Sequence, residues 1–308
     1  MSLKDFQQTT ALGPNALFLL ENATVETKPG GHHQPKQIVI DELPLSKLPV
    51  AMRKMGWHTS AALMQRWFDS PGWQMPEEWK GEEGQPDPLR LSKAACEETL
   101  VRMNWAMRFK QCQEALKVAE ERLNTRNAID RLKVLLRKAG WDGKGTFALG
   151  STEFSAREVD ATAQVNIARM GSSFDVLDDM YGALGRATLK VGVAGRTFTK
   201  LDNALGEARN YFQIEYAGFY IRDHYDFNGP QFLGIWTAER VLTKAEMISV
   251  TTPDGPSIFN VQGAAIAKVT NDDFRAYRAK TGMGGDFLIY SDVLWKEVNQ
   301  VIDLGPAT

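Results

Sequence analysis

Hydrophobic and polar positions repeat at helical spacing through the first half of the chain. Apolar residues recur at steps of three and four within 92–123 and again within 125–140, which predicts two long helices, each beginning at a Ser or Thr that can cap it. A shorter amphipathic helix is predicted at Thr59–Phe68. Residues 1–50 lack such a period, and we expect an extended arm there with a short strand at Gln37–Ile40.

Alternating positions dominate the second half, which is typical of strands. Residues Phe212–Phe227 alternate over much of their length, and the apolar run Phe232–Trp236 follows the turn Asn228-Gly229-Pro230, so a long hairpin is predicted between these two segments. Further strands are expected at Leu189–Val193 and Phe287–Tyr290, and further helices at Ser155, at Ser173–Leu184, at Asp272–Lys280 and at Leu294–Val301.

These patterns predict an α+β protein with a helical N-terminal half packed on a mostly antiparallel, β-rich C-terminal half. The acidic, proline-bearing stretch Glu82–Pro88 and the glycine-rich turn Gly140–Gly150 indicate boundaries near residues 85 and 150. We expect an N-terminal arm with a tryptophan-rich helical segment (1–85), a long helical hairpin (86–150) and a β-rich α+β domain (151–308).

Composition narrows the classes of partner and location. The chain of 308 residues is 43% hydrophobic and 24% charged, as in ordinary globular proteins. Its formal charge of −2 gives no field that would gather nucleic acid, so nucleic acid is not an expected partner. No stretch approaches the roughly 18 apolar residues that a membrane span needs, and the N-terminus lacks the features of a signal peptide. We expect a protein that is cytoplasmic as synthesised. Secretion by a route that needs no signal peptide is compatible with this expectation.

Two groups of residues have both a structural and a functional interpretation. Four tryptophans, Trp57, Trp67, Trp73 and Trp79, suit either a packed core or a binding surface, and their exposure would distinguish the two. Nine Lys or Arg against four Asp or Glu within 108–138 suit either a solvated face or a surface for an acidic partner. The two cysteines, Cys96 and Cys112, are expected to be buried thiols.

The densest polar cluster lies at residues 222–226. In a strand, Arg222, His224 and Asp226 would face one side, and Asp223 and Tyr225 the other. The first row places a histidine between a cation and a carboxylate, which can tune its pKa towards neutrality. Alternatively, a bulge or turn can bring Asp223 and Asp226 together to bind a hard divalent cation. The structural alternative is that Asp226 belongs to a hairpin turn.

Two segments carry a resemblance to known proteins. With MRKMGWHTSAALMQRWF at Met52–Phe68 and GFYIRDHYDFNGPQFLGIW at Gly218–Trp236, the chain resembles an uncharacterised bacterial domain-of-unknown-function family that is sometimes encoded near type VI secretion genes. Asp223, Tyr225 and Asp226 are similar to the Asp-x-Tyr-Asp motif of colicin M-type bacteriocins, which cleave lipid-linked peptidoglycan precursors with a magnesium ion. The His-Arg pair that follows this motif in those enzymes has no counterpart here, because no histidine follows His224.

The resemblance implies a bacterial antagonism protein: a type VI secretion effector, or an effector-associated protein that meets the secretion machinery or an immunity protein. If it is an enzyme, it implies hydrolysis of a phosphate ester or lipid-linked diphosphate, with Mg²⁺ held by Asp223 and Asp226 and assistance from Tyr225, His224 or Arg222. The competing hypothesis is a non-enzymatic adaptor, chaperone or structural protein that binds a protein partner.

Overall fold

The computed structural model describes residues 44–81, 84–172, 175–204, 206–251 and 266–307. Two compact units divide the chain, and each is built from three separate stretches. Unit 1 comprises Met1–Gln74, Ser172–Gly185 and Asp226–Asp286, and unit 2 comprises Met75–Gly171, Arg186–Tyr225 and Phe287–Thr308. The chain therefore passes between the units several times, whereas the boundaries predicted near residues 85 and 150 describe contiguous segments.

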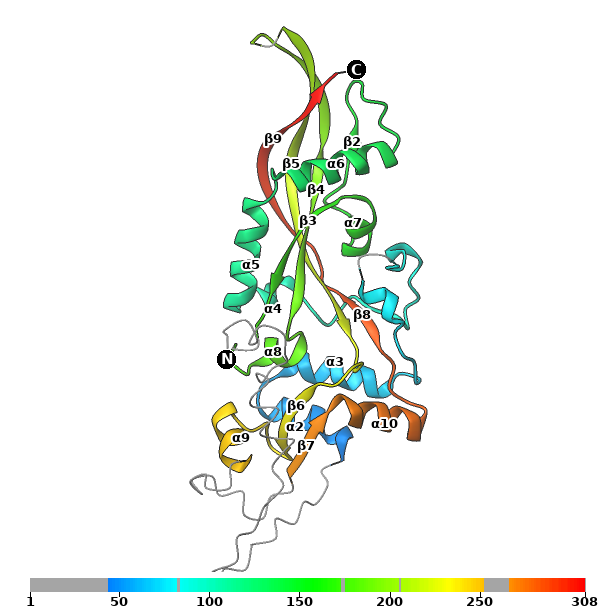
Figure 1. Cartoon of the computed structure of the whole chain (residues 1–308), viewed down its shortest axis with the longest axis vertical. Helices are drawn as coiled ribbons and strands as arrows, with labels where there is room; N and C mark the ends of the chain where they lie inside the picture. Colours follow the sequence, from blue (N-terminus) through cyan, green and yellow to red (C-terminus); the bar gives the residue numbers. More distant parts are fainter. Residues whose placement is uncertain (1–43, 82–83, 173–174, 205, 252–265, 308) are drawn as a thin grey trace, which may run out of the picture. The chain divides into compact units, whose positions relative to one another are not determined.

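Unit 2 is built on a mostly antiparallel sheet, which with the helices confirms the α+β class. The long strands β4 (Ala187–Asp202) and β5 (Glu207–Tyr225) form a twisted hairpin, and β9 (Leu294–Pro306) curves alongside β5 (Figure 1). The shorter strands are β1 (Cys96–Glu97), β2 (Ala148–Leu149), β3 (Gln164–Met170) and β8 (Phe287–Tyr290). Strands β2 and β3 pair with β4, β8 pairs with β5, and β1 joins β8 in the parallel sense.

Alternation along the central hairpin gives unit 2 its core. Leu189, Val191 and Val193 on β4 are fully buried, as are Phe219 and Ile221 on β5. Helices α5 and α6 pack against β3, and also against β4 and β9 respectively, while α7 packs against β3 and β4. The helical elements of this unit are η3 (Glu77–Lys80), η4 (Pro88–Arg90), α4 (Met103–Ala106), α5 (Lys110–Glu121), α6 (Arg126–Lys138) and α7 (Ala156–Thr162).

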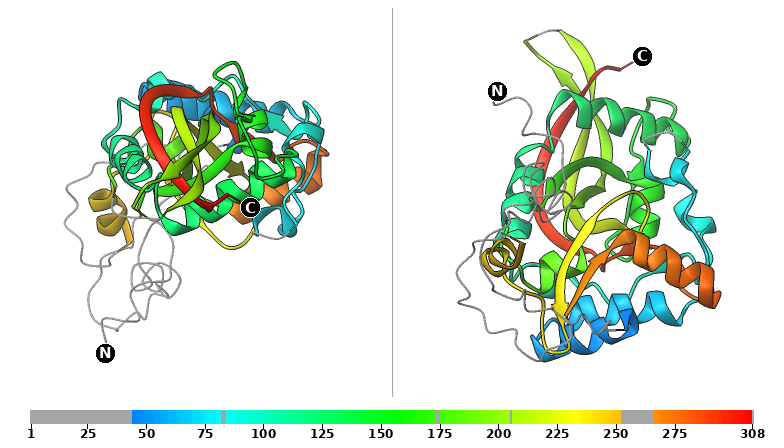
Figure 2. Two further views of the ribbon diagram at one scale, coloured as in Figure 1. Left: turned by 90° about the horizontal axis from the view of Figure 1, so that it is seen from above. Right: turned by 60° about the horizontal axis from the view of Figure 1, so that its bottom comes forward.

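Unit 1 has an aromatic core of its own. Trp67 is fully buried, and its ring contacts Phe68, Phe227 and Phe274 at centroid distances of 4.9 to 5.3 Å. These contacts join α3 (His58–Asp69) to α10 (Asn271–Thr281), which lie side by side in Figure 2. The other elements are η2 (Leu45–Lys47), α2 (Leu48–Lys54), α8 (Asp179–Ala183), α9 (Lys244–Thr251) and the antiparallel pair β6 (Phe232–Thr237) and β7 (Ile266–Thr270).

The structure supports the core interpretation of the tryptophans and the cysteines. Trp67 is fully buried and Trp57, Trp73 and Trp79 are half-buried, so none of these four forms the exposed surface that would favour an adaptor. Cys96 and Cys112 are both buried thiols, and burial raises the pKa of the Cys112 thiol to about 11. Both thiols therefore pack as apolar side chains.

Several predicted elements are wrong because tertiary pairing overrides local spacing. Residues 92–102 are not helical, since Cys96–Glu97 pairs with β8. The helix predicted from Ser92 is divided into α4, which begins at Met103, and α5, which begins at Lys110. The terminal helix predicted at 294–301 is strand β9, which pairs with β5. Residues 45–54 form η2 and α2 instead of an extended arm, and the strand expected at 37–40 lies outside the described residues.

The predicted hairpin also has a different partner. Strand β5 pairs with β4, which precedes it in the chain, and β6 pairs with β7 instead of β5. The helix expected from Ser173 begins at Asp179, whose N-cap is Asp178. Three local predictions are confirmed. They are the helix at 59–68, which is α3, the capping box at Ser155, which starts α7, and the end of a helix at Gly282, which is left-handed at the end of α10.

Candidate functional site

The predicted polar cluster lies at the end of β5, where the chain leaves unit 2. Arg222 and His224 lie on one face of the strand and Asp223 and Tyr225 on the other, because residues 222–225 pair in regular register with β8. Asp226 follows directly and belongs to unit 1. The five predicted residues are therefore shared between the units.

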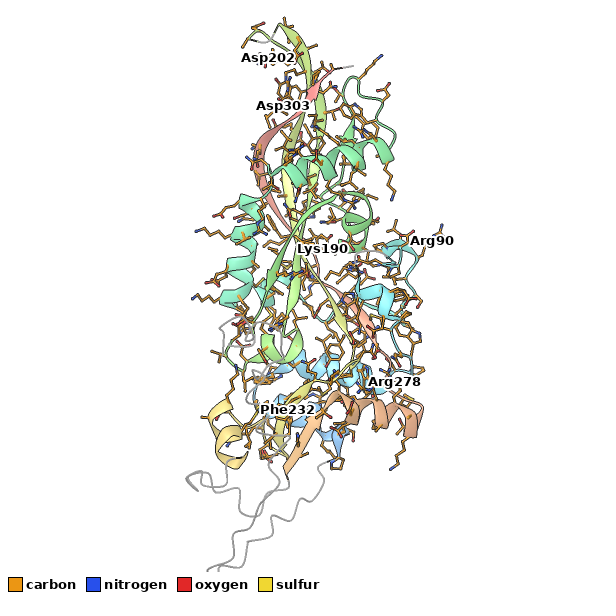
Figure 3. The ribbon with its side chains drawn as sticks, in the orientation of Figure 1. Arg90, Lys190, Asp202, Phe232, Arg278 and Asp303 are labelled. Carbon is orange, nitrogen blue, oxygen red and sulfur yellow. The ribbon has the colours of Figure 1, made fainter. Side chains whose placement is uncertain are left out.

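Arg222 joins a buried group centred on Asp160, which we call the Asp160 cluster: Asp160, Lys190, Tyr220, Arg222 and Tyr290. Asp160 Oδ1 accepts hydrogen bonds from Lys190 Nζ at 2.6 Å and from the Tyr220 hydroxyl at 2.8 Å. Its Oδ2 accepts one from the Tyr290 hydroxyl at 2.8 Å and lies 3.6 Å from Arg222 Nε. All five residues belong to unit 2, and Figure 3 shows Lys190 partway along β4, far from the hairpin tip at Asp202.

Local sequence explains how Asp160 reaches the sheet. Ser155 and Glu158 form a reciprocal capping box that starts α7 at Ala156, four residues before Asp160. Gly192 of β4 lets α7 approach closely, since a Cβ there would lie 2.2 Å from Val159 Cγ1. Lys190 is two residues from Gly192 and therefore lies on the same face of β4, towards α7.

The cluster holds two cations for one carboxylate in a nearly solvent-free environment. The side chains of Asp160, Arg222 and Lys190 are only 4%, 3% and 12% exposed. Burial raises the pKa of Asp160, but Lys190 and Arg222 outweigh this effect and hold that pKa below its usual value. Burial lowers the pKa of Lys190 despite the attraction of Asp160.

Both tyrosines act as proton-bearing donors to Asp160. Burial, and then the charge of Asp160, raises the pKa of the Tyr220 and Tyr290 hydroxyls. They therefore keep their protons at neutral pH, and the carboxylate receives two hydrogen bonds besides its ion pairs.

The guanidinium of Arg222 retains hydrogen-bonding capacity. Its Nη1 donates to Gln85 Oε1 at 2.6 Å, and its carbon lies 5.8 Å from the centroid of the Tyr290 ring. Within the described residues, Nε and Nη2 of Arg222 are buried without a hydrogen-bond partner. Buried donors left unpaired cost free energy, so this guanidinium favours an additional acceptor. Gln85 itself is exposed at the surface of the unit.

The remaining predicted residues have structural contacts. His224 Nε2 lies 3.0 Å from the Trp79 carbonyl oxygen, and accordingly donates to it. The Tyr225 ring stacks on Phe287 at 4.9 Å, and burial raises the pKa of its hydroxyl. Asp226 Oδ1 accepts the backbone N–H of Asn228 at 3.0 Å, which is the turn role that the sequence allows for it.

Asp223 lies near the end of β5, and Asp226 follows the strand directly. These two aspartates belong to different units. Across the described ranges, no group of three or more His, Cys, Asp and Glu side chains is placed to hold a metal ion. The expectation of Mg²⁺ stays a prediction.

Sequence reasoning missed Asp160, Lys190, Tyr220 and Tyr290. A weak signal was present for Asp160, which stands on the apolar side of a capped helix beside Val159. Alternation placed Lys190 on the polar side of its strand, but α7 covers that side. The pairing of strands far apart in the sequence carried no local signal.

Comparisons with known proteins give the family but no activity. No helix in the described part of the chain is long and apolar enough to cross a membrane. Neither a curated protein nor a solved structure matches the chain. One family model matches residues 43–304, and its description is a family of unknown function, DUF6402. Since this match covers most of its length, the chain belongs to the DUF6402 family.

Proposed function

We propose that this chain is a bacterial antagonism protein, an effector or effector-associated protein of type VI secretion, whose unit 2 binds a phosphate ester or diphosphate at the Asp160 cluster. The biological setting is supported by the sequence resemblance. The observation that carries the ligand class is the buried Arg222, which shares one carboxylate with Lys190 and has two nitrogens, Nε and Nη2, without a hydrogen-bond partner among the described residues.

A phosphate group suits this arrangement chemically. A guanidinium presents its donors in a planar fork that matches phosphate oxygens, and an ammonium adds a point charge beside it. The cluster carries two positive charges and one negative charge, so an added anion would offset the excess. A carboxylate ligand offers two acceptor oxygens, whereas a phosphate offers three or more and can therefore satisfy more of these donors.

Gln85 occupies the position through which such a ligand would approach. Its neutral amide oxygen accepts from Arg222 Nη1, while its side chain is exposed. Hydrogen bonds between two charged groups are stronger than those to a neutral acceptor, so a phosphate oxygen would displace this amide. The ligand would then reach Nη1 first and the buried donors after local rearrangement.

The proposal extends from binding of the phosphate ester or diphosphate to its hydrolysis. Lys190 and Arg222 would stabilise negative charge that develops on a phosphoryl group. His224 lies on the same face of β5 as Arg222 and is the candidate for proton transfer. Asp223, Tyr225 and Asp226 remain the residues that the resemblance assigns to catalysis, with Mg²⁺ as their predicted ion.

The ligand class is tested by calorimetric titration of the full chain with pyrophosphate. We expect Gln85→Ala to bind more tightly than the wild type, by up to about tenfold, because the hydrogen bond that the ligand must break is gone. Gln113→Ala is the matched control, since Gln113 is also exposed and its amide donates to the Met107 carbonyl in the same unit. Its affinity should equal that of the wild type.

Two results would overturn the ligand proposal. One is the absence of pyrophosphate binding by both the wild type and Gln85→Ala, which would leave the cluster as an internal ion-pair network only. The other is equal strengthening by the Gln85 and Gln113 substitutions, which would place the binding elsewhere.

A further inference from the structure

Helix α6 presents a concentrated positive charge to solvent. Its apolar side is buried in unit 2, through residues Ala128, Leu132, Leu135 and Leu136. Its exposed side carries four cations and one carboxylate, namely Arg126, Arg131, Arg137, Lys138 and Asp130. The chain as a whole has a net charge of −2, so this local excess does not follow from composition.

Helix stability explains only part of this charge pattern. Arg137 and Lys138 lie in the last turn, where the helix dipole favours cations. Arg126 is the first residue of the helix, where the dipole disfavours a cation, and its side chain is 94% exposed. Its ion pair with Asp130 spans 3.8 Å between two exposed side chains and contributes little to stability. Helix stability therefore gives no reason for a cation at this position.

An apolar residue lies within this basic face. Val134 is 49% exposed and is flanked along the helix by Arg131, one turn before it, and by Lys138, one turn after it. An apolar centre with a charged rim is the usual arrangement of a protein-binding patch. Two cations of α6 also interact with the sheet. Arg131 Nε donates to the Gln164 carbonyl oxygen of β3 at 3.3 Å, and the charge of Lys133 helps to lower the pKa of Asp303, which burial raises and Arg209 lowers.

We propose that the exposed face of α6, formed by Arg126, Arg131, Val134, Arg137 and Lys138, docks an acidic peptide segment of a partner protein. Carboxylates of the segment would pair with the four cations, and an apolar side chain would cover Val134. This surface is separate from the Asp160 cluster and does not depend on its ligand.

The observations favour a protein partner over the other polyanions. A helix that binds a lipid surface inserts an apolar face, whereas the apolar face of α6 is already buried. Nucleic-acid binding rests on phosphate contacts across a broadly basic surface, which a chain of net charge −2 does not supply, and it leaves Val134 without a role. Charge complementarity with an apolar contact is the signature of an acidic segment.

The test is fluorescence anisotropy with a labelled 20-residue peptide that places glutamates and leucines at helical spacing. The α6 variant carries Arg126→Gln, Arg131→Gln, Arg137→Gln and Lys138→Gln. The matched control removes four exposed cations in or next to α5, through Arg108→Gln, Lys110→Gln, Lys117→Gln and Arg122→Gln, so both variants have the same net charge. We expect the α6 variant to lose at least about tenfold in affinity and the control to stay within about twofold.

A third variant separates docking from a purely electrostatic attraction. Val134→Ser keeps every charge and should weaken binding several-fold, because the apolar contact at the centre is lost. Equal losses in the α6 and α5 variants would overturn the proposal, since they would indicate a diffuse field. The proposal would also be overturned if the wild-type protein did not bind the peptide but bound phosphatidylglycerol vesicles or duplex DNA.

Discussion

At the scale of single residues, Asp160 determines how unit 2 responds to acid. The folded protein holds its pKa below the unfolded value of about 3.9, so its contribution to the free energy of unfolding is complete above that pH and is lost as pH falls through the folded pKa. We expect Asp160→Asn to lower stability at pH 7 by about 3 to 5 kcal/mol, because Lys190 and Arg222 lose their carboxylate. Below pH 4 the difference from the wild type should shrink, since the unfolded wild-type chain then binds a proton at this carboxyl and the folded protein loses that part of its stability. Urea midpoints from pH 7 to pH 3 measure both effects, with the exposed Glu153→Gln as control. A constant difference across this range would contradict the role of Asp160.

At the scale of elements, the approach of α7 to β4 positions that carboxylate. A Cβ at Gly192 would lie 2.2 Å from Val159 Cγ1 and 3.2 Å from the Ala163 carbonyl oxygen. Gly192→Ala should therefore lower the free energy of unfolding by about 1 to 3 kcal/mol through overpacking, as measured in urea. Adding Val159→Ala removes the atom in closest conflict, so the double variant should be more stable than the sum of the two single effects predicts. Strict additivity of the two substitutions would show that this contact does not limit the distance between helix and strand.

At the scale of the whole molecule, the effector proposal predicts toxicity that depends on the candidate site. A bacterium that expresses the full chain should grow poorly when the protein is directed to one compartment, cytoplasm or periplasm, because the target lies there. Asp226→Ala, shown to be folded by circular dichroism, should restore growth if the resemblance to colicin M-type enzymes reflects chemistry. Harmless wild-type protein in both compartments would instead favour the adaptor hypothesis, for which the basic face of α6 provides a surface. If Asp226→Ala unfolds the protein, the turn with Asn228 is the role of this residue.

The sequence by itself determined the features that depend on neighbours along the chain. The capping box at Ser155, the helix at 58–69 and the left-handed Gly282 follow from hydrogen bonds and backbone conformations within a few residues. Alternation likewise placed Arg222 and His224 on the opposite face from Asp223 and Tyr225. The α+β class follows from the same local periods.

Only the tertiary structure decided which segments meet. Residues 294–301 have a helical pattern but form a strand, because their backbone N–H and C=O groups pair with those of β5. The Asp160 cluster joins side chains as far as 130 residues apart, and no local pattern specifies that Asp160, Lys190 and Tyr290 will share one buried space. The physical reason is that pairing and burial depend on the free energy of the assembled unit, to which residues distant in sequence contribute as much as adjacent ones.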